Sequence, residues 1–284
     1  MKKKALVILA GILAVLLLLI FALPHSLYRS AWPYRDEPGF EMVSYTDLER
    51  CISVDLTDAQ RVELISLMKE QKARFAGFGI RRDAGNCQIV MNDGPVAEGY
   101  RYYSFIGIDD EAYVQAAYGR RMRNYRMKEA DAQIVRDFCR ALTDPAGETP
   151  GLAFLEEFFT VGKDGRWEVW MQAMFSSYSG AVEEAIPIYH SGVAPYMTEQ
   201  ALLDLELSRT LSNLDMLCKA KADDWHLGLI WIHPASERGF YAYEVGISYE
   251  KDGSTQFATL DGSYAVNGNG QIDSFYVDLS SLQE

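Results

Sequence analysis

A long apolar run follows a short basic stretch at the start of the chain. Lys2, Lys3 and Lys4 precede residues 5–23, none of which carries a charged or strongly polar side chain. A helix of this length extends about 28 Å, close to the roughly 30 Å hydrocarbon core of a bilayer. The lysines favour a cytoplasmic N-terminus. The pattern predicts a transmembrane signal anchor over residues 1–23, with the bulk of the chain extracytoplasmic at the cell membrane.

A cleaved signal peptide is the alternative to an anchor. Cleavage requires small residues at the first and third positions before the cut. A cut after Ser26 places Pro24 at the third position, and a cut after Ala31 places Arg29 there. The apolar run also exceeds the length of about 7–15 residues that is usual for a signal peptide. The sequence therefore favours an uncleaved, single-pass anchor.

Residues 24–45 have no hydrophobic period and are predicted to form a tether, whereas residues 46–143 have the pattern of an α+β domain. Thr57 and Gln60 have the spacing of a capping box, and the apolar positions after them predict a helix of about five turns, through Phe75, that ends at Gly77 and Gly79. Strands are predicted over residues 87–92, 100–108, 112–118 and 122–127, and a second helix over residues 129–142.

Residues 144–150 contain two prolines and a glycine, and they are predicted to form a linker. Three helical patterns follow, over residues 152–161, 167–175 and 198–218. The period then changes to two, which predicts strands over residues 225–233, 240–250, 254–266 and 271–279. Asn267 and Gly268 begin a tight hairpin, and Gly262 indicates a bulge within a long strand. Residues 151–284 are therefore predicted to be a second α+β domain, with three helices followed by a bent antiparallel meander.

Strand alternation also predicts which side chains lie inside the second domain. One face of each of three strands is apolar, and these faces are expected to pack against the helices at Phe154, Phe158 and Trp167. The predicted inward side chains are Trp225, Leu227, Leu229 and Trp231, then Tyr241, Tyr243, Val245 and Ile247, and finally Phe275, Val277 and Leu279.

The charge of the chain changes between its two halves. Residues 1–150 carry 20 acidic and 20 basic side chains, whereas residues 151–284 carry 20 acidic and only 7 basic ones. This asymmetry supports a domain boundary near the linker. An acidic second half would repel the phosphates of a nucleic acid, so nucleic acid is not an expected partner.

Four cysteines leave their pairing open. The spacing of Cys51, Cys87, Cys139 and Cys218 matches no metal or redox motif. In an oxidising compartment they could form two disulfides by three different pairings, or they could be buried free thiols or form one structural bridge. No metal site and no cofactor are predicted, because the chain has neither a glycine-rich phosphate loop after a strand nor the surroundings of a serine or cysteine nucleophile.

The second half resembles a known superfamily. Phe154, Phe158 and Phe159 form an aromatic first helix, Arg166 and Trp167 follow it, and the chain ends with the strand pair 262–266 and 270–277. In these features residues 151–284 resemble the nuclear transport factor two-like superfamily, which implies a cone-shaped α+β domain. The superfamily contains dehydratases, isomerases and polyketide cyclases, and also non-catalytic parts of bacterial secretion and conjugation machinery. The resemblance therefore implies no single function.

Enzymes of that superfamily place a His or Asp acid–base group inside the cone, and two residues here are candidates for that role. His233 shares a strand face with Trp231, and Glu244 lies on the opposite side of its strand from Tyr243 and Val245. If the Glu244 face lined the cone, this carboxylate would be buried and its pKa raised, as in a general base. The more ordinary interpretation is a strand-end histidine and a solvent-facing glutamate.

The most unusual charge feature is a basic run in the first domain. It comprises Arg120, Arg121, Arg123, Arg126 and Lys128. These side chains could contact an anionic surface such as lipid headgroups, since the anchor keeps the domain near the membrane. Alternatively, they could protect a solvated strand from pairing at a sheet edge.

These patterns predict a membrane-anchored extracytoplasmic binding or interaction protein, without a catalytic role. Its expected partners are the membrane, through residues 5–23, and an unidentified protein of a bacterial envelope assembly or a small molecule. The alternative is a small-molecule enzyme of lyase or isomerase type, which would use the cone of the second domain with His233 or Glu244 as its base.

Overall fold

The computed structural model of the 284-residue chain is described here for most of its length. The described residues are 11–15, 23–31, 42–79, 85–92, 103–118, 121–144, 149–160, 165–178, 180–211, 213–214, 225–235, 237, 239–251 and 253–282. Most of the predicted anchor lies outside these ranges. Within them, no helix has both the length and the apolar character needed to cross a membrane.

The chain has an α+β fold, as predicted, and divides into two compact units. The first comprises residues 1–50 and 56–140, and the second comprises residues 51–55 and 141–284. The main division therefore lies just before the predicted linker. The sequence did not predict that residues 51–55 leave the first half of the chain to join the second unit.

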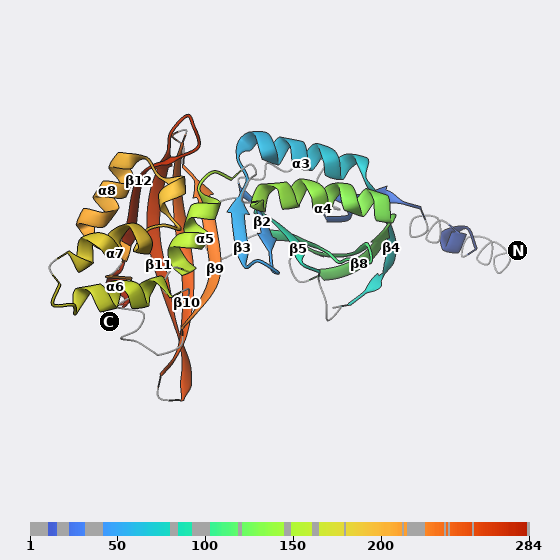
Figure 1. Ribbon diagram of the computed structural model, residues 1–284. Helices are drawn as coiled ribbons and strands as arrows, with labels where there is room; N and C mark the ends of the chain where they lie inside the picture. The colour runs from blue at the N-terminus through green and yellow to red at the C-terminus, as the bar shows by residue number, and fades with distance from the viewer. Residues whose placement is uncertain are drawn as a thin grey trace, which may run out of the picture. The chain divides into compact units, whose positions relative to one another are not determined.

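The first unit is an antiparallel sheet with two long helices on one face (Figure 1). Its strands lie in the order β1-β4-β8-β7-β6-β5-β2. The elements are β1 (His25–Ser26), α2 (Leu27–Ala31), β2 (Met42–Asp47), α3 (Asp58–Glu70), β4 (Lys72–Phe78), β5 (Cys87–Asn92), β6 (Tyr103–Ile108), β7 (Tyr113–Tyr118), β8 (Arg121–Met127) and α4 (Glu129–Thr143).

The capping box at the start of α3 is confirmed, but the predicted length of the helix is wrong. The Thr57 side chain accepts from the Gln60 backbone, and the Gln60 side chain accepts from the Thr57 backbone. The helix ends at Glu70, and Phe75 belongs to β4, which pairs with β8 and β1. Pairing with two neighbouring strands satisfies the backbone hydrogen bonds of these residues. This pairing is favoured over the helix that the apolar spacing through Phe75 predicted.

Residues 25–31 belong to the first unit, although the sequence placed them in a tether. β1 pairs with β4, through His25 and Ala73, and the Leu27 amide donates to the Gln71 carbonyl. Leu27 and Tyr28 are buried, with 0% and 6% of their surface exposed. The folded unit therefore begins within two residues of the end of the predicted anchor.

The second unit is a five-stranded sheet with its helices on one face (Figure 1). Its strands lie in the order β3-β9-β10-β11-β12, and only the β3–β9 pair is parallel. The elements are β3 (Ile52–Asp55), α5 (Leu152–Thr160), α6 (Arg166–Met174), α7 (Ala181–Tyr189), η3 (Ala194–Tyr196), α8 (Glu199–Ser208), β9 (Trp225–Pro234), β10 (Phe240–Lys251), β11 (Ser254–Val266), β12 (Ile272–Asp278) and η4 (Ser280–Leu282).

The helices and turns of the second unit agree only in part with the sequence prediction. Helix α7 was not predicted, and it contains Pro187, a residue that normally interrupts a helical pattern. The predicted hairpin turn before β12 is confirmed: the Asn267 side chain accepts from two backbone amides, and Gly270 has a positive φ. The predicted bulge at Gly262 is wrong, because Gly262 pairs regularly with both Tyr243 and Val277.

Aromatic rings fill the space between the sheet and the helices of the second unit. Phe154 and Phe158 of α5 contact Phe275, at centroid distances of 4.8 and 4.6 Å, and Phe275 stacks on Tyr243 at 5.8 Å. The Tyr243 hydroxyl donates to the Tyr276 carbonyl across Gly262, where a Cβ would lie 2.2 Å from the ring. Gly262 is therefore required by the close approach of this ring.

Candidate functional site

A register shift in β9 determines which side chains point away from the helices of the second unit. Leu227 pairs with Ile247, but Ile230 pairs with Val245, so Gly228 and Leu229 together lie opposite Gly246. Such a bulge moves all later side chains of the strand to the other face.

The bulge explains why two predicted core residues of β9 do not lie inside. Before it, Trp225 is buried against the helices; after it, Ile230 and Ile232 take that role, with 2% and 0% of their surface exposed. Leu229 and Trp231 were predicted to lie inside, and both predictions are wrong: Leu229 is 37% exposed, and Trp231 lies on the opposite face from Ile230 and Ile232. Tyr243, Val245 and Ile247 of β10 are buried as predicted.

We call the side of this sheet that faces away from the helices the polar face. Pairing in register places its side chains in rows across the strands. Glu244 lies opposite Trp231 on one side and Asp261 on the other, and Asp261 lies opposite Asp278. The polar face comprises Trp231, His233, Glu244, Asp261, Ser263, Tyr276 and Asp278.

At one end of the polar face, Asp55 links β3 to β9. The parallel pairing of Ser53 with Trp231 and of Val54 with Ile232 brings the Asp55 carboxylate beside the end of β9. One Asp55 oxygen accepts from Trp231 Nε1 at 3.0 Å, and the other lies 2.9 Å from His233 Nδ1. Because a carboxylate can only accept, Nδ1 of His233 carries the hydrogen in this bond.

The other ring nitrogen of His233 faces a second carboxylate. Nε2 lies 3.8 Å from Glu244 Oε1, and this atom is buried without a hydrogen-bond partner among the described residues. Burial lowers the pKa of His233, but the hydrogen bond to Asp55 and the charges of Asp55 and Glu244 outweigh it, so the pKa is raised. The site therefore stabilises an imidazolium between two carboxylates.

The two candidate catalytic residues of the sequence analysis are thus adjacent, but they lie outside the interior of the unit. Glu244 is 52% exposed and sits on the polar face, so it is not a buried carboxylate of a cone. An imidazole oriented by a carboxylate can act as an acid or a base. Here, however, its second nitrogen is buried beside Glu244.

Cavities lined by described residues lie around the helices, one of about 370 Å³ between α8 and β12 and one of about 240 Å³ among α6, α7 and α8.

The basic run of the first unit is divided between the two faces of β8. β8 lies between β4 and β7, so its charges do not protect an edge of this sheet. Arg123 shares a face with the buried Tyr125, whereas Arg126 is on the opposite face and lies over the Tyr113 ring at 5.0 Å. Lys128 is exposed just after the strand, and Arg120 and the Arg121 side chain lie outside the described residues.

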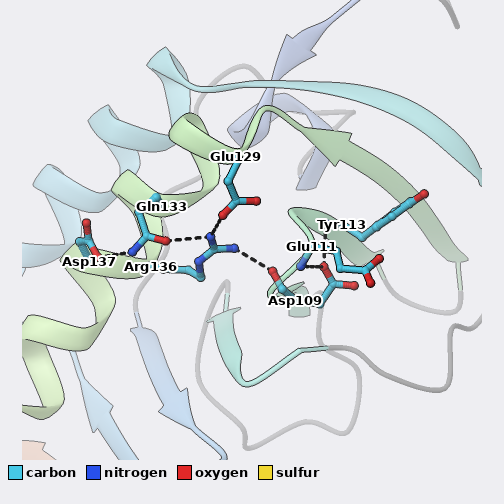
Figure 2. A network of polar contacts seen from close by, with 7 residues as sticks. All are labelled: Asp109, Glu111, Tyr113, Glu129, Gln133, Arg136 and Asp137. Carbon is cyan, nitrogen blue, oxygen red and sulfur yellow. Dashed lines mark hydrogen bonds and ion pairs between the residues drawn. The ribbon is translucent and has the colours of Figure 1, made fainter.

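The first unit also contains a buried arginine that the sequence did not reveal (Figure 2). Arg136 of α4 has 4% of its side chain exposed and pairs with Glu129. Its guanidinium also donates to the Asp109 backbone carbonyl at 2.8 Å and to Gln133 Oε1 at 2.9 Å. The Asp109 side chain accepts in turn from the amides of Glu111 and Tyr113, at 3.0 and 2.8 Å. The network joins α4 to the β6–β7 turn.

Asp55 was also missed, because the short strand that carries it was not predicted. The available signal was the alternation of Ile52 and Val54 with Ser53 and Asp55.

Among the described residues, no group of three or more His, Cys, Asp or Glu side chains is arranged to hold a metal ion. Comparisons with protein-family models, with curated proteins and with solved structures find no match to this chain.

Proposed function

We propose that this protein is a single-pass, membrane-anchored extracytoplasmic binding protein that acts within a bacterial envelope assembly. The observation that carries the proposal is the contrast between the two sides of the second sheet. The side toward the helices is filled by Phe154, Phe158 and Tyr243, which leaves the polar face to present charged and aromatic groups. Packed aromatic interiors favour binding through a surface over catalysis in an enclosed pocket.

The position of the first folded element supports an uncleaved anchor. A signal-peptide cut after Ala31 would remove the buried residues Leu27 and Tyr28, and a cut after Ser26 would remove β1. Either cut would delete packing and backbone hydrogen bonds from the first unit. If residues 5–23 span the membrane, only Pro24 separates the span from β1, so the first unit is held at the membrane surface.

The chemistry of the polar face supports a basic protein partner. Asp261 lies between Glu244 and Asp278 on neighbouring strands, and like charges directly opposite each other destabilise a sheet. Tyr276, on the same face, is 61% exposed. A partner surface rich in Lys and Arg would relieve the repulsion and could also contact the ring face.

The resemblance to the nuclear transport factor two-like superfamily remains part of this proposal. The order of helices α5 to α8 followed by the meander β9 to β12 agrees with it. Non-catalytic members of that superfamily serve in secretion and conjugation machinery, which fits a binding role at the envelope. The polar face would then be the surface through which the second unit joins such an assembly.

An enzymatic function is the second candidate, and one observation favours it. His233 is oriented by Asp55 and faces Glu244, so the pair could transfer a proton to a small substrate of a lyase or isomerase reaction. This candidate requires that Nε2 become accessible to the substrate. If His233→Gln still binds the partner but no longer supports the protein's function in cells, the enzymatic candidate would be favoured over the binding function.

Photo-crosslinking in intact cells tests the binding function. A photoreactive phenylalanine analogue is introduced at Tyr276, on the polar face, or at Tyr178, which is similarly exposed at 58% but lies beside α7. We expect one discrete crosslinked protein from position 276 and none from position 178. The additional change Asp261→Lys should abolish that crosslink. Crosslinks that form equally from both positions, or that survive Asp261→Lys, would contradict the proposed surface.

A further inference from the structure

Two cysteines of the first unit meet in its core. Cys87 is the first residue of β5, and Cys139 is a fully buried residue of α4. They are separated by 52 positions in the sequence, yet their thiols are hydrogen-bonded to each other. Both are buried, with 5% and 0% of their surface exposed. The fold therefore selects one pairing from those that the sequence left open.

The surroundings of the pair do not suit a reactive thiol or a metal ligand. Tyr45 lies close to both cysteines, and it is itself 2% exposed. The Cys87 hydrogen bond and burial raise the pKa of the Cys139 thiol. A thiol of this kind stays protonated and is a poor nucleophile. Cys51 is exposed and belongs to the other unit, so within the described residues the first unit contains no competing thiol.

We propose that Cys87 and Cys139 are joined by a structural disulfide in the mature protein. Two S–H bonds are broken and one S–S bond is formed, and the two electrons and two protons pass to a protein or small-molecule disulfide, which is reduced to two thiols. Because Cys139 is fully buried in the folded unit, the exchange takes place during folding. The inference rests on the proposed export, since oxidising compartments supply such an oxidant.

The bridge would connect β5 to α4 and close a long loop of the first unit. Closing a loop of this length restricts the unfolded chain, and the expected loss on reduction is about 10 °C in the melting temperature of the first unit. The same bridge would fix α4, and with it the Arg136 network, on the sheet.

Peptide mapping of the full chain tests the proposal. Cells are quenched in acid, free thiols are blocked with N-ethylmaleimide under denaturing conditions, and the protein is purified in detergent and digested without reduction. We expect a peptide that links Cys87 to Cys139, and a Cys51 that carries the maleimide. Maleimide on both Cys87 and Cys139, or a link from either to Cys51 or Cys218, would overturn the proposal.

A refolding arm separates failure of the pairing from failure of the export. The purified chain is reduced, unfolded and refolded in a mixture of reduced and oxidised glutathione, and it is mapped in the same way. If the bridge forms on refolding but the protein from cells carries maleimide at both positions, the export is wrong and the native bridge is overturned with it. If the bridge forms in neither sample, the pairing itself is wrong and the export is untouched. Reduction of the refolded protein should lower its melting temperature, and Cys51→Ser should not change that shift.

Discussion

Asp55 accepts from two aromatic side chains of one neighbouring strand, so a single carboxylate holds both Trp231 and His233. The two rings lie against each other, with their centroids 4.9 Å apart. Hydrogen bonds to a charged acceptor are stronger than bonds between neutral groups. At the scale of single residues, the polar face is therefore organised by a residue that comes from the first half of the chain.

The raised pKa of His233 predicts how stability depends on pH. Its contribution is fully present below about pH 6.5, the ordinary histidine value, and is lost as the pH rises through the raised pKa of the folded protein. The free energy of unfolding in urea should fall by about 1–2 kcal/mol from pH 5.5 to pH 9, given the usual worth of a charge-assisted hydrogen bond. This fall should be absent in His233→Gln. An equal fall in both proteins would mean that His233 does not carry it.

At the scale of elements, the bulge in β9 shows where prediction from the sequence stops. Alternation correctly predicted that Trp225 to His233 form a strand, and it correctly predicted the buried face of β10. It could not predict that Ile230 and Ile232 point inward. The apolar pattern of the strand gives no sign of the bulge, in which Gly228 and Leu229 together lie opposite Gly246. The short strands β2 and β3 were also missed.

Two neighbouring substitutions in β9 test the bulge directly. Ile232 is fully buried, whereas Leu229 is 37% exposed, although strict alternation predicts the reverse. Ile232→Ala should lower the free energy of unfolding by about 2–5 kcal/mol, and Leu229→Ala should lower it by much less. Denaturant unfolding of the two variants measures the difference. A larger loss for Leu229→Ala would show that the strand has no bulge at this position.

The candidate site was predictable only in part. His233 and Glu244 could be named from the sequence because they interrupt apolar strands, and the structure brings them within 3.8 Å. Asp55 could not be assigned to them, because 178 positions separate it from His233 and only the parallel β3–β9 pair brings the two together. Arg136 was hidden because two of its three partners are a side chain seven residues earlier and a backbone carbonyl in the β6–β7 turn.

At the scale of the whole molecule, the second unit is not a continuous piece of sequence. β3 contributes Ile52 and Val54 to the core of this unit and Asp55 to the polar face. A protein cut at the linker would therefore lose one strand of the sheet, as well as the partner of His233. This changes the expectation that residues 151–284 fold as a complete domain.

Fragment unfolding tests the role of β3. A fragment of residues 141–284 should be less cooperative and less stable in urea than the second unit within the full chain, because the β9 edge and two buried apolar side chains lose their partners. The His233 pKa, measured by NMR titration, should be lower in the fragment than in the full chain. A fragment with the full chain's His233 pKa would show that Asp55 does not set it.

In the proposed topology, residues 5–23 anchor the chain in the membrane and both folded units lie outside the cytoplasm. Cys51 offers a natural probe of this topology because its thiol is exposed, whereas Cys87 and Cys139 are buried. The measurement is the reaction of a membrane-impermeant maleimide with Cys51 in intact spheroplasts, in a Cys218→Ser background and with Cys51→Ser as the blank. We expect the same extent of labelling before and after lysis. Labelling that appears only after lysis would place the folded units in the cytoplasm and contradict this topology.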